Sequence, residues 1–408
     1  MNLNSRTNKI KTLQSILVVF FIVFFSSSIK TIFQVFFVLM AESFDQTRGS
    51  FAISASVFMI VFGIASPIVG FLADRLGPKR VLVAGLQTAG IALLGCAVLS
   101  SYGAFIFLYG IAASFALAAM AYVPTGILVD RTIPEKYIGI VYATLTSGAA
   151  IGFIVLSPVW VFAQEYFHWR QVFFAAGLTF LLPLQILASR YLPDLQSKQP
   201  RPTSGMPIVS ALLDLFTSRI FLALSLSFFG CGVTMAFIDV HMVAHFQDIF
   251  LTPPQVAVVM VVFGASELIS SFVAGWLCDR LPIGYVIAAS YALRSAALFL
   301  LSMMSNFSGI LMFSISFGLS YMGTVIGTST YTLNAFTKER RGLALGSIWM
   351  IHQLGAFLST QLGANSFDVF GSYHLVITIV GIFSILSAVI SLMILPATPE
   401  NLKKNPSG

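Results

Sequence analysis

Two ionisable residues, Lys30 and Glu267, lie deep inside long apolar runs of this sequence. Each lies about 14 residues into its run, and a helical rise of about 1.5 Å per residue places both near the middle of a hydrocarbon layer roughly 30 Å thick. A charged group at that depth costs roughly 3 kcal/mol or more unless it is paired or hydrated, so its presence points to function. A lysine there can bind an anion, and a carboxyl group in a low dielectric can take up a proton near neutral pH. The pair predicts coupling of an anion to a proton, and the structural alternatives are snorkelling of Lys30 and a helix-to-helix hydrogen bond of Glu267.

Other polar residues in the apolar runs are candidates for the same site. Tyrosine and asparagine can donate hydrogen bonds to a carboxylate without bringing a full charge into the membrane. Arg294, midway along another run, can donate to Glu267, to Asp239 or to backbone carbonyls. Each of these residues can instead hold neighbouring helices together. The candidates for binding the solute or the proton are Lys30, Glu267, Tyr122, Tyr331, Asn334, Arg294 and His352.

A polar cluster of Asp239, His241 and His245 lies toward the end of one apolar run. His241 and His245 are four residues apart and share one face of a helix. No further pair of ligands accompanies the two histidines, so we expect an outer gate or interfacial polar residues rather than a metal site, and no cofactor. Histidine also adds sensitivity to pH near neutrality.

The composition is that of an integral membrane protein. Hydrophobic residues make up 57% of the 408-residue chain, charged residues only 9%, and the mean hydropathy is +0.92, so polar residues are too few to cover a soluble domain. The apolar runs reach the ~20 residues of a membrane-spanning helix rather than the ~10 alternating residues of a barrel strand. The net charge is +7, but no basic patch lies outside the membrane-flanking loops, which argues against nucleic acid as a partner.

Twelve apolar runs divide the chain into two sets of six. A linker at 193–218, rich in proline, serine and basic residues, joins an N-terminal half, 1–192, to a C-terminal half, 219–408. We therefore expect an all-α membrane protein with twelve transmembrane helices in two pseudo-symmetric six-helix halves. Pro124 and Pro158 are expected to bend their helices. The spans are expected near 16–40, 50–73, 79–100, 104–128, 138–163, 170–192, 219–246, 253–277, 284–304, 308–333, 342–365 and 371–395.

A short charged loop separates the second and third runs. It reads Gly70-Phe-Leu-Ala-Asp-Arg-Leu-Gly-Pro-Lys-Arg80, and a shorter copy, Gly275-Trp-Leu-Cys-Asp-Arg-Leu281, occupies the corresponding place in the second half. Its glycines let two helix ends approach closely, and Asp74 can interact with a helix N-terminus or with an arginine. The repeat indicates duplication and a gating role rather than a turn that only fixes topology. The expected gating residues are Gly70, Asp74, Arg75, Gly77, Arg80, Asp279 and Arg280.

This pair of loops resembles the signature of the major facilitator superfamily of secondary transporters. The run Ser28-Ile-Lys-Thr-Ile-Phe-Gln-Val-Phe-Phe37 is similar to the first helix of the monocarboxylate transporter family, in which a lysine takes part in coupling substrate and proton. In that family an aspartate lies eight residues, and an arginine four residues, before the glycine of the second signature. Glu267 and Ser271 occupy these positions here. An acidic residue is therefore retained, as glutamate in place of aspartate, but the substrate-binding arginine is absent. This absence argues against a simple lactate-like site.

Basic residues predict the orientation in the membrane. Of the 22 lysines and arginines, Lys30 and Arg294 lie inside spans and only Arg48 and Arg170 lie on the side opposite the N-terminus, so the other 18 lie on the side of the termini. By the positive-inside rule both termini are cytoplasmic. We expect a monomer in the plasma membrane, the inner membrane of a bacterium, with lipid, a small solute and protons as its partners.

The sequence favours a secondary transporter of a small organic solute, an organic anion such as a monocarboxylate, driven by proton symport. A proton-antiport exporter of a drug, siderophore or metabolite is the alternative within the same class, although a glycine-proline signature of drug antiporters is not clear between Gly148 and Pro158. A non-transporting receptor or assembly protein on the same fold is the alternative from another class. No catalytic or nucleotide-binding motif is found, so we do not expect an enzyme or an ATP-driven pump.

Overall fold

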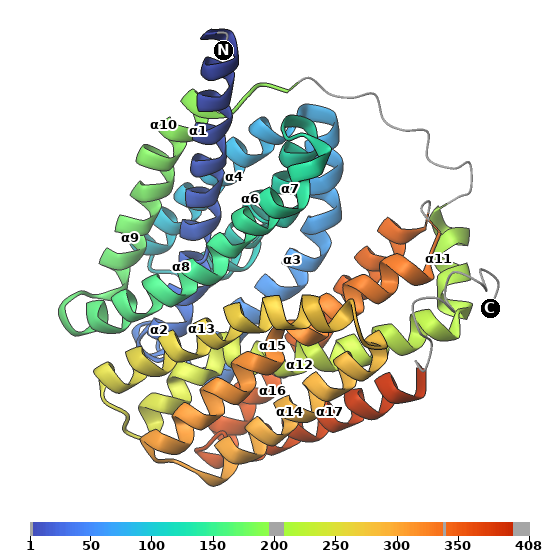
Figure 1. Ribbon diagram of the computed structural model, residues 1–408. Helices are drawn as coiled ribbons and strands as arrows, with labels where there is room; N and C mark the ends of the chain where they lie inside the picture. Colours follow the sequence, from blue (N-terminus) through green and yellow to red (C-terminus); the bar gives the residue numbers. More distant parts are fainter. Residues whose placement is uncertain (1–2, 196–207, 338–339, 395–408) are drawn as a thin grey trace. The chain divides into compact units, whose positions relative to one another are not determined.

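The computed structural model describes residues 3–195, 208–337 and 340–394 (Figure 1). Within these ranges the secondary structure is helical and contains no strand. Twelve helical stretches are long and apolar enough to cross a membrane, and each overlaps one of the predicted spans. The prediction of an all-α protein with twelve transmembrane helices is confirmed. Many large apolar side chains remain exposed, as expected of helices that contact lipid.

Contacts between residues divide the chain into two units. Unit 1 comprises Met1–Gln46 and Ile53–Arg201, and unit 2 comprises Thr47–Ala52 and Pro202–Gly408. The main boundary between the units, between residues 201 and 202, lies in the segment that the sequence suggested as a linker. The short stretch Thr47–Ala52, at the start of the second span, groups with the second unit.

Unit 1 contains the first six spans. The first, fourth and sixth spans are each built from several helical segments, whereas α3, α4 and α8 are continuous. The helices are α1 (Leu3–Ser26), α2 (Ser28–Ser43), α3 (Arg48–Leu76), α4 (Pro78–Val98), α5 (Tyr102–Phe105), η1 (Ile106–Ala113), α6 (Ser114–Met120), α7 (Tyr122–Thr132), η2 (Glu135–Tyr137), α8 (Ile138–Tyr166), α9 (Trp169–Thr179), η3 (Phe180–Leu184) and α10 (Gln185–Tyr191).

Unit 2 contains six further spans, each a single continuous helix. They follow a short helix, α11, which lies inside the segment that the sequence suggested as a linker. The helices are α11 (Ile208–Thr217), α12 (Arg219–Asp248), α13 (Pro253–Cys278), α14 (Ile283–Met303), α15 (Phe307–Ala335), α16 (Arg341–Phe370) and α17 (His374–Ile394).

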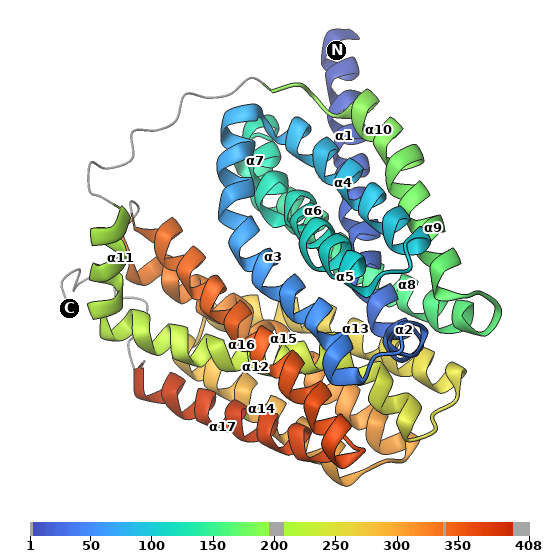
Figure 2. The same cartoon turned by 180° about the vertical axis from the view of Figure 1, so that it is seen from behind.

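The two units repeat one pattern of helix pairing. In unit 1 the first span packs on the fifth, α1 on α8, and the third span packs on the fourth and sixth, α4 on α6 and α9. In unit 2 the corresponding pairs are α12 on α16 and α14 on α15 and α17. The pair α14 and α17 lies side by side in both views (Figures 1 and 2). The same neighbours in both units agree with the duplication that the loop repeat predicted.

Two spans of unit 1 are interrupted beside predicted site residues. Ser27 separates α1 from α2, and its carbonyl accepts the N–H groups of both Lys30, at 3.2 Å, and Thr31, at 3.0 Å, while its own backbone stays in the helical region. Ala121, with φ −87° and ψ −151°, ends α6, so that α7 begins at Tyr122. Pro124 explains this break, because its ring lacks an N–H and excludes the carbonyl four residues earlier. Interrupted helices at membrane depth are typical of transporter binding sites.

The predicted topology can be tested with cysteine labelling or reporter fusions at three positions. Ser101 is exposed at the start of α5 and is expected outside the cell, whereas Ser204 and Lys403 are expected in the cytoplasm. The last two positions lie outside the described residues. An external location for residue 204 would contradict the model of two halves joined on the inner side.

Candidate functional site

Three charged residues of unit 2, each from a different helix, lie within electrostatic range of Tyr321 of α15. These are Asp239 of α12, Glu267 of α13 and Arg294 of α14, and the Arg294 guanidinium lies 5.8 Å from the centre of the Tyr321 ring. Asp239, Glu267 and Tyr321 are partly buried, whereas Arg294 is fully buried. We call Asp239, Glu267, Arg294 and Tyr321 the Tyr321 cluster. It combines one fixed positive charge with two groups that can exchange protons.

Arg294 forms hydrogen bonds with neutral groups of the neighbouring helices. It donates to the carbonyls of Ser320 and Tyr321 at 3.2 and 3.0 Å, and its Nη atoms donate to the hydroxyls of Thr234 and Thr324 at 2.9 and 3.0 Å. Of the partners that the sequence allowed, backbone carbonyls are the ones found. A buried guanidinium with this many donors satisfied ties α14 to both α12 and α15 and fixes the backbone that carries Tyr321.

The helix that carries Glu267 is tied to α15 near the same level. The Ser270 hydroxyl donates to the Leu319 carbonyl at 2.7 Å and accepts the Met322 N–H at 3.2 Å. Ser271 occupies the position at which the monocarboxylate family has an arginine, and its hydroxyl donates to the Glu267 carbonyl at 3.2 Å. The α13 side of the cluster therefore carries a carboxyl group at residue 267 and no cation at residue 271.

Lys30, in unit 1, sits on a backbone held by aromatic side chains. Tyr109 donates its hydroxyl to the Ile29 carbonyl at 3.2 Å, and the Trp160 indole donates to the Thr31 hydroxyl at 3.1 Å. Lys30 itself is partly buried, one turn after the irregular residue Ser27. These contacts fix the carbonyls and hydroxyl next to the lysine and so define where its side chain starts.

The remaining predicted residues of unit 2 do not join the Tyr321 cluster. Tyr331 is 1% exposed and packs in an apolar cluster, and Asn334 is exposed near the end of α15. His352 is buried with its ring 4.6 Å from Phe228 and 5.2 Å from Trp349. The surroundings of Tyr331 and His352 favour packing roles. The structure describes the backbone at Tyr122 but not its side chain.

The two histidines at the end of α12 have different surroundings. His241 Nε2 hydrogen-bonds to the Thr360 carbonyl at 2.8 Å, so this nitrogen carries the proton. The His245 ring lies 6.0 Å from Tyr373 and 5.9 Å from His374. Among the described residues no group of three or more metal-ligating side chains is found.

The charged loop after α3 forms an ion pair inside unit 1. Asp74 binds Arg131, at the end of α7, at 3.1 Å, which identifies the arginine that the sequence left open. Arg75 lies 4.4 Å from the Phe71 ring, and Arg280 of the second copy lies 4.3 Å from the Trp276 ring. Both copies thus place an arginine over the aromatic ring four residues earlier, a further sign of duplication.

The other gating candidates lie in or near the turns that follow α3 and α13. Gly77 has φ +90°, a conformation that other residues rarely adopt, and it caps α4. Gly70 lies within the last two turns of α3, Arg80 in the first turn of α4, and Asp279 directly after α13. Whether they gate transport stays a prediction.

Replacing Asp74 tests the loop directly. Asp74→Asn keeps the size of the side chain but removes its ion pair with Arg131, and we expect solute uptake to fall at least about fivefold. The Asp74 side chain is 63% exposed, and exposed ion pairs contribute at most about 1 kcal/mol, so the melting temperature should change little. Lys136→Gln, which removes a charge from another exposed turn of unit 1 and leaves the pair intact, is the matched control. A collapse of expression and melting temperature in Asp74→Asn would make the loop structural.

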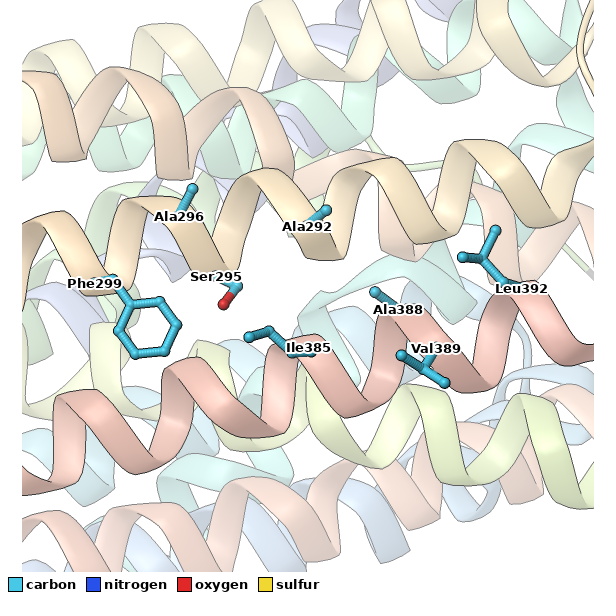
Figure 3. Close-up of a pocket in the computed structure, with 8 residues that line it drawn as sticks. All are labelled: Ala292, Ser295, Ala296, Phe299, Ile385, Ala388, Val389 and Leu392. Carbon is cyan, nitrogen blue, oxygen red and sulfur yellow. The ribbon is translucent and has the colours of Figure 1, made fainter.

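An apolar groove of about 330 Å³ lies between α14 and α17 and holds none of the predicted site residues (Figure 3). Its one polar residue, Ser295, donates its hydroxyl to the Gly381 carbonyl at 2.9 Å. The lining therefore contains no charged side chain and no free hydrogen-bond donor that could bind an anion. The lining residues are Ala292, Ser295, Ala296, Phe299, Ile385, Ala388, Val389 and Leu392.

Comparison with known proteins agrees with this architecture. The Major Facilitator Superfamily profile matches residues 18–360 and, again, 220–408. An uncharacterised MFS-type transporter of Bacillus subtilis, YcxA, is 28% identical over 90% of this chain and 91% of the relative. Monocarboxylate transporter 13 of Rattus norvegicus is 23% identical over 86% of this chain and 81% of its own length. The multidrug efflux pump LfrA of Mycolicibacterium smegmatis is 29% identical over 42% of this chain and 34% of its own length.

Among solved structures, a bacterial homologue of the human lysosomal transporter Spinster, in an inward-facing and unoccupied conformation, has the same fold. The TM-score is 0.76 at 11% identity, with 98% of each chain covered. The twelve spans, the repeated pairing of helices and the superfamily match lead to one conclusion. The chain belongs to the Major Facilitator Superfamily and is a multi-pass membrane transporter of a small solute.

Proposed function

We propose that this transporter carries a small organic anion, such as a monocarboxylate, together with a proton. The observation that carries the proposal is the Tyr321 cluster, in which Asp239 and Glu267 lie within electrostatic range of one phenol and the fully buried Arg294 lies 5.8 Å from its ring. With one positive and two negative groups, the cluster is closest to neutral when it holds one proton. A carboxyl group at membrane depth takes up that proton readily, because a low dielectric favours its neutral form.

The anion is the counterpart of Lys30 in unit 1. A lysine at membrane depth favours a negatively charged ligand, because a charge-assisted hydrogen bond offsets part of the desolvation of both groups. The similarity to proteins named monocarboxylate transporters points the same way. Ser271 in place of an arginine means that the carboxylate is held differently from lactate in that family.

Lys30 in one unit and Glu267 in the other then serve one transport cycle. Loading the anion compensates the lysine, and loading the proton compensates the carboxylates, so the fully loaded carrier has the fewest uncompensated charges. The charges of Lys30, Arg294, Asp239 and Glu267 sum to zero, so the empty carrier and the carrier with both ligands can change state, whereas a carrier with only one ligand keeps a net buried charge that resists the change. This dependence on both ligands is what makes the carrier a symporter.

A stabilisation screen of the purified protein tests the proposal. Ligands that bind the folded state raise its melting temperature, so carboxylates, amino acids and cationic drugs can be compared at pH 5.5 and 7.5. We expect carboxylates to stabilise the protein and to do so more strongly at the lower pH, where the proton is also loaded. Stabilisation by cationic drugs alone would favour the alternative, a proton-antiport exporter. Binding without any transport would favour a receptor.

A further inference from the structure

Three side chains with soft ligand atoms meet near the middle of α12 and α16. The Cys231 sulfur lies 3.1 Å from the Met235 sulfur, one turn further along α12, and the His352 Nε2 of α16 lies 3.4 Å from the same methionine sulfur. Histidine, cysteine and acidic side chains alone form no group of three that could hold a metal in the described part of the chain, so this set depends on its thioether. We call Cys231, Met235 and His352 the Met235 triad.

The distances in the Met235 triad are close to those between ligands of one metal ion. Cysteine sulfur and histidine nitrogen bind a small ion such as zinc at about 2.3 and 2.0 Å, so two ligand atoms of a tetrahedral site lie roughly 3.5 Å apart. The two distances around the Met235 sulfur are shorter than this value by at most a few tenths of an ångström. The methionine side chain is unbranched and adaptable, so a small rotation can open the set around an ion.

The surroundings of the Met235 triad are apolar and hold its ligands in place. The His352 ring packs 4.6 Å from the Phe228 ring and 5.2 Å from the Trp349 ring, which fixes the direction of its Nε2. Cys231 is fully buried, whereas Met235 is only partly buried and is the side from which an ion can reach the set. Apolar surroundings exclude water, and this favours a soft ion over a strongly hydrated one such as Mg²⁺.

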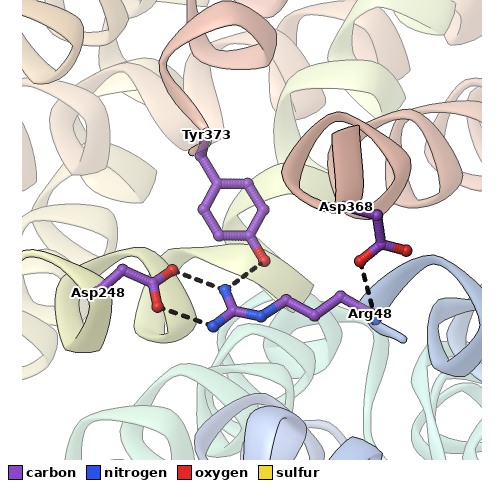
Figure 4. A network of polar contacts seen from close by, with 4 residues as sticks. All are labelled: Arg48, Asp248, Asp368 and Tyr373. Carbon is purple, nitrogen blue, oxygen red and sulfur yellow. Dashed lines mark hydrogen bonds and ion pairs between the residues drawn. The ribbon is translucent and has the colours of Figure 1, made fainter. Parts of the chain in front are cut away.

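The charge beside Cys231 favours a monovalent ion. Arg48, whose side chain is also mostly buried, is neutralised by Asp248, whose two carboxylate oxygens it binds at 2.6 and 2.7 Å (Figure 4). Among the described residues, the hydrogen-bond partners of Arg294 are carbonyls, hydroxyls and the Cys231 sulfur, which its Nη1 contacts at 3.3 Å. A divalent ion on that sulfur would add a further positive charge next to the guanidinium. A monovalent ion that replaces the thiol proton leaves the net charge unchanged.

We propose that the Met235 triad is a binding site for Cu(I), with Cys231 as a thiolate, Met235 bound through its thioether and His352 bound through Nε2. The thiolate is the form of cysteine that binds metals, so the thiol proton passes to water as the sulfur bonds the ion. Thiolate and thioether sulfur select Cu(I), and imidazole suits copper as well. The inference does not depend on which solute is carried or on proton coupling.

Binding of Ag(I) to the purified full-length protein tests the proposal, because Ag(I) is a soft monovalent ion like Cu(I) and is not oxidised in air. Cys96→Ser with Cys278→Ser provides the background, since these other two cysteines are free thiols. In equilibrium dialysis we expect a single Ag(I) per chain, and we expect Zn²⁺ to bind at least about a hundredfold more weakly. Cys231→Ser should abolish binding, and Met235→Leu and His352→Gln should each weaken it at least about tenfold.

Met242→Leu is the matched control, because Met242 is another buried methionine of α12 and lies outside the Met235 triad. Leucine nearly conserves the volume of methionine, so both methionine variants should fold. If the serine background does not fold, Met235→Leu and Met242→Leu are compared in the wild type. Equal affinity in these two variants would mean that a thiol alone holds the ion, and it would overturn the inference. Zn²⁺ bound as tightly as Ag(I), or no Ag(I) bound, would also overturn it.

Discussion

Glu267→Gln is expected to abolish proton-driven accumulation of a carboxylate while leaving exchange of the solute across the membrane. Glutamine has nearly the size of glutamate but can neither take up nor release a proton, so the carrier can no longer draw on a proton gradient. In exchange, the carrier moves solute in both directions and never has to return empty, so this activity does not require a change of protonation. In proteoliposomes, uptake driven by a pH gradient should fall at least about tenfold, and exchange should stay within about threefold of the wild type.

Asp239→Asn is the comparison for this variant, because it removes the other carboxylate that acts on the Tyr321 phenol. If Glu267 is the proton carrier, Asp239→Asn retains proton-driven accumulation. If both variants lose it, the two carboxylates titrate as one unit. Full accumulation with an unchanged pH profile in Glu267→Gln would remove this residue from coupling.

Lys30→Ala is expected to weaken carboxylate binding at least about tenfold. The change removes the positive charge at membrane depth in the first span, and a charge-assisted hydrogen bond to a carboxylate is about twice as strong as a neutral one. The stabilising effect of the best carboxylate from the screen, titrated against melting temperature, measures the loss.

Two controls accompany the lysine variant. Lys30→Arg keeps the charge and should retain part of the binding, whereas Lys136→Ala removes a loop lysine that lies 5.4 Å from the Tyr137 ring and should have no effect. Unchanged affinity in Lys30→Ala would assign the lysine to structure and would direct attention to Arg294 and His241.

The twelve spans could be predicted from the sequence because the length of an apolar run sets whether it crosses a bilayer. The same logic singled out Lys30, Glu267 and Arg294, since a charge inside such a run is visible without knowledge of packing. The break before Tyr122 also had a signal, because Pro124 excludes the carbonyl four residues earlier.

Partners across helices could not be predicted in this way. Tyr321 and Tyr109 are ordinary aromatic residues of apolar runs, and only the packing of α13, α14 and α15 brings charged groups within electrostatic range of Tyr321. The partner of Asp74 could have been any nearby arginine, and the choice of Arg131 follows from the pairing of α7 with the charged loop.

Two further features depended on contacts that are distant in the sequence. Arg48 was visible only as an external basic residue, because Asp248 lies 200 positions away. The helix α11 falls in a stretch whose composition is typical of a linker, yet Leu215 packs into the apolar core of unit 2. The helical structure of α11 is therefore explained by its packing against unit 2 and not by its local composition.

The central claim, symport of a carboxylate with a proton, is tested most directly by following the internal pH of proteoliposomes while labelled carboxylate enters without an imposed pH gradient. Protein-free vesicles give the background from passive permeation of the acid. We predict that the interior acidifies in step with uptake, and that Glu267→Gln removes this acidification. Uptake with no pH change, or with alkalinisation of the interior, would contradict the account.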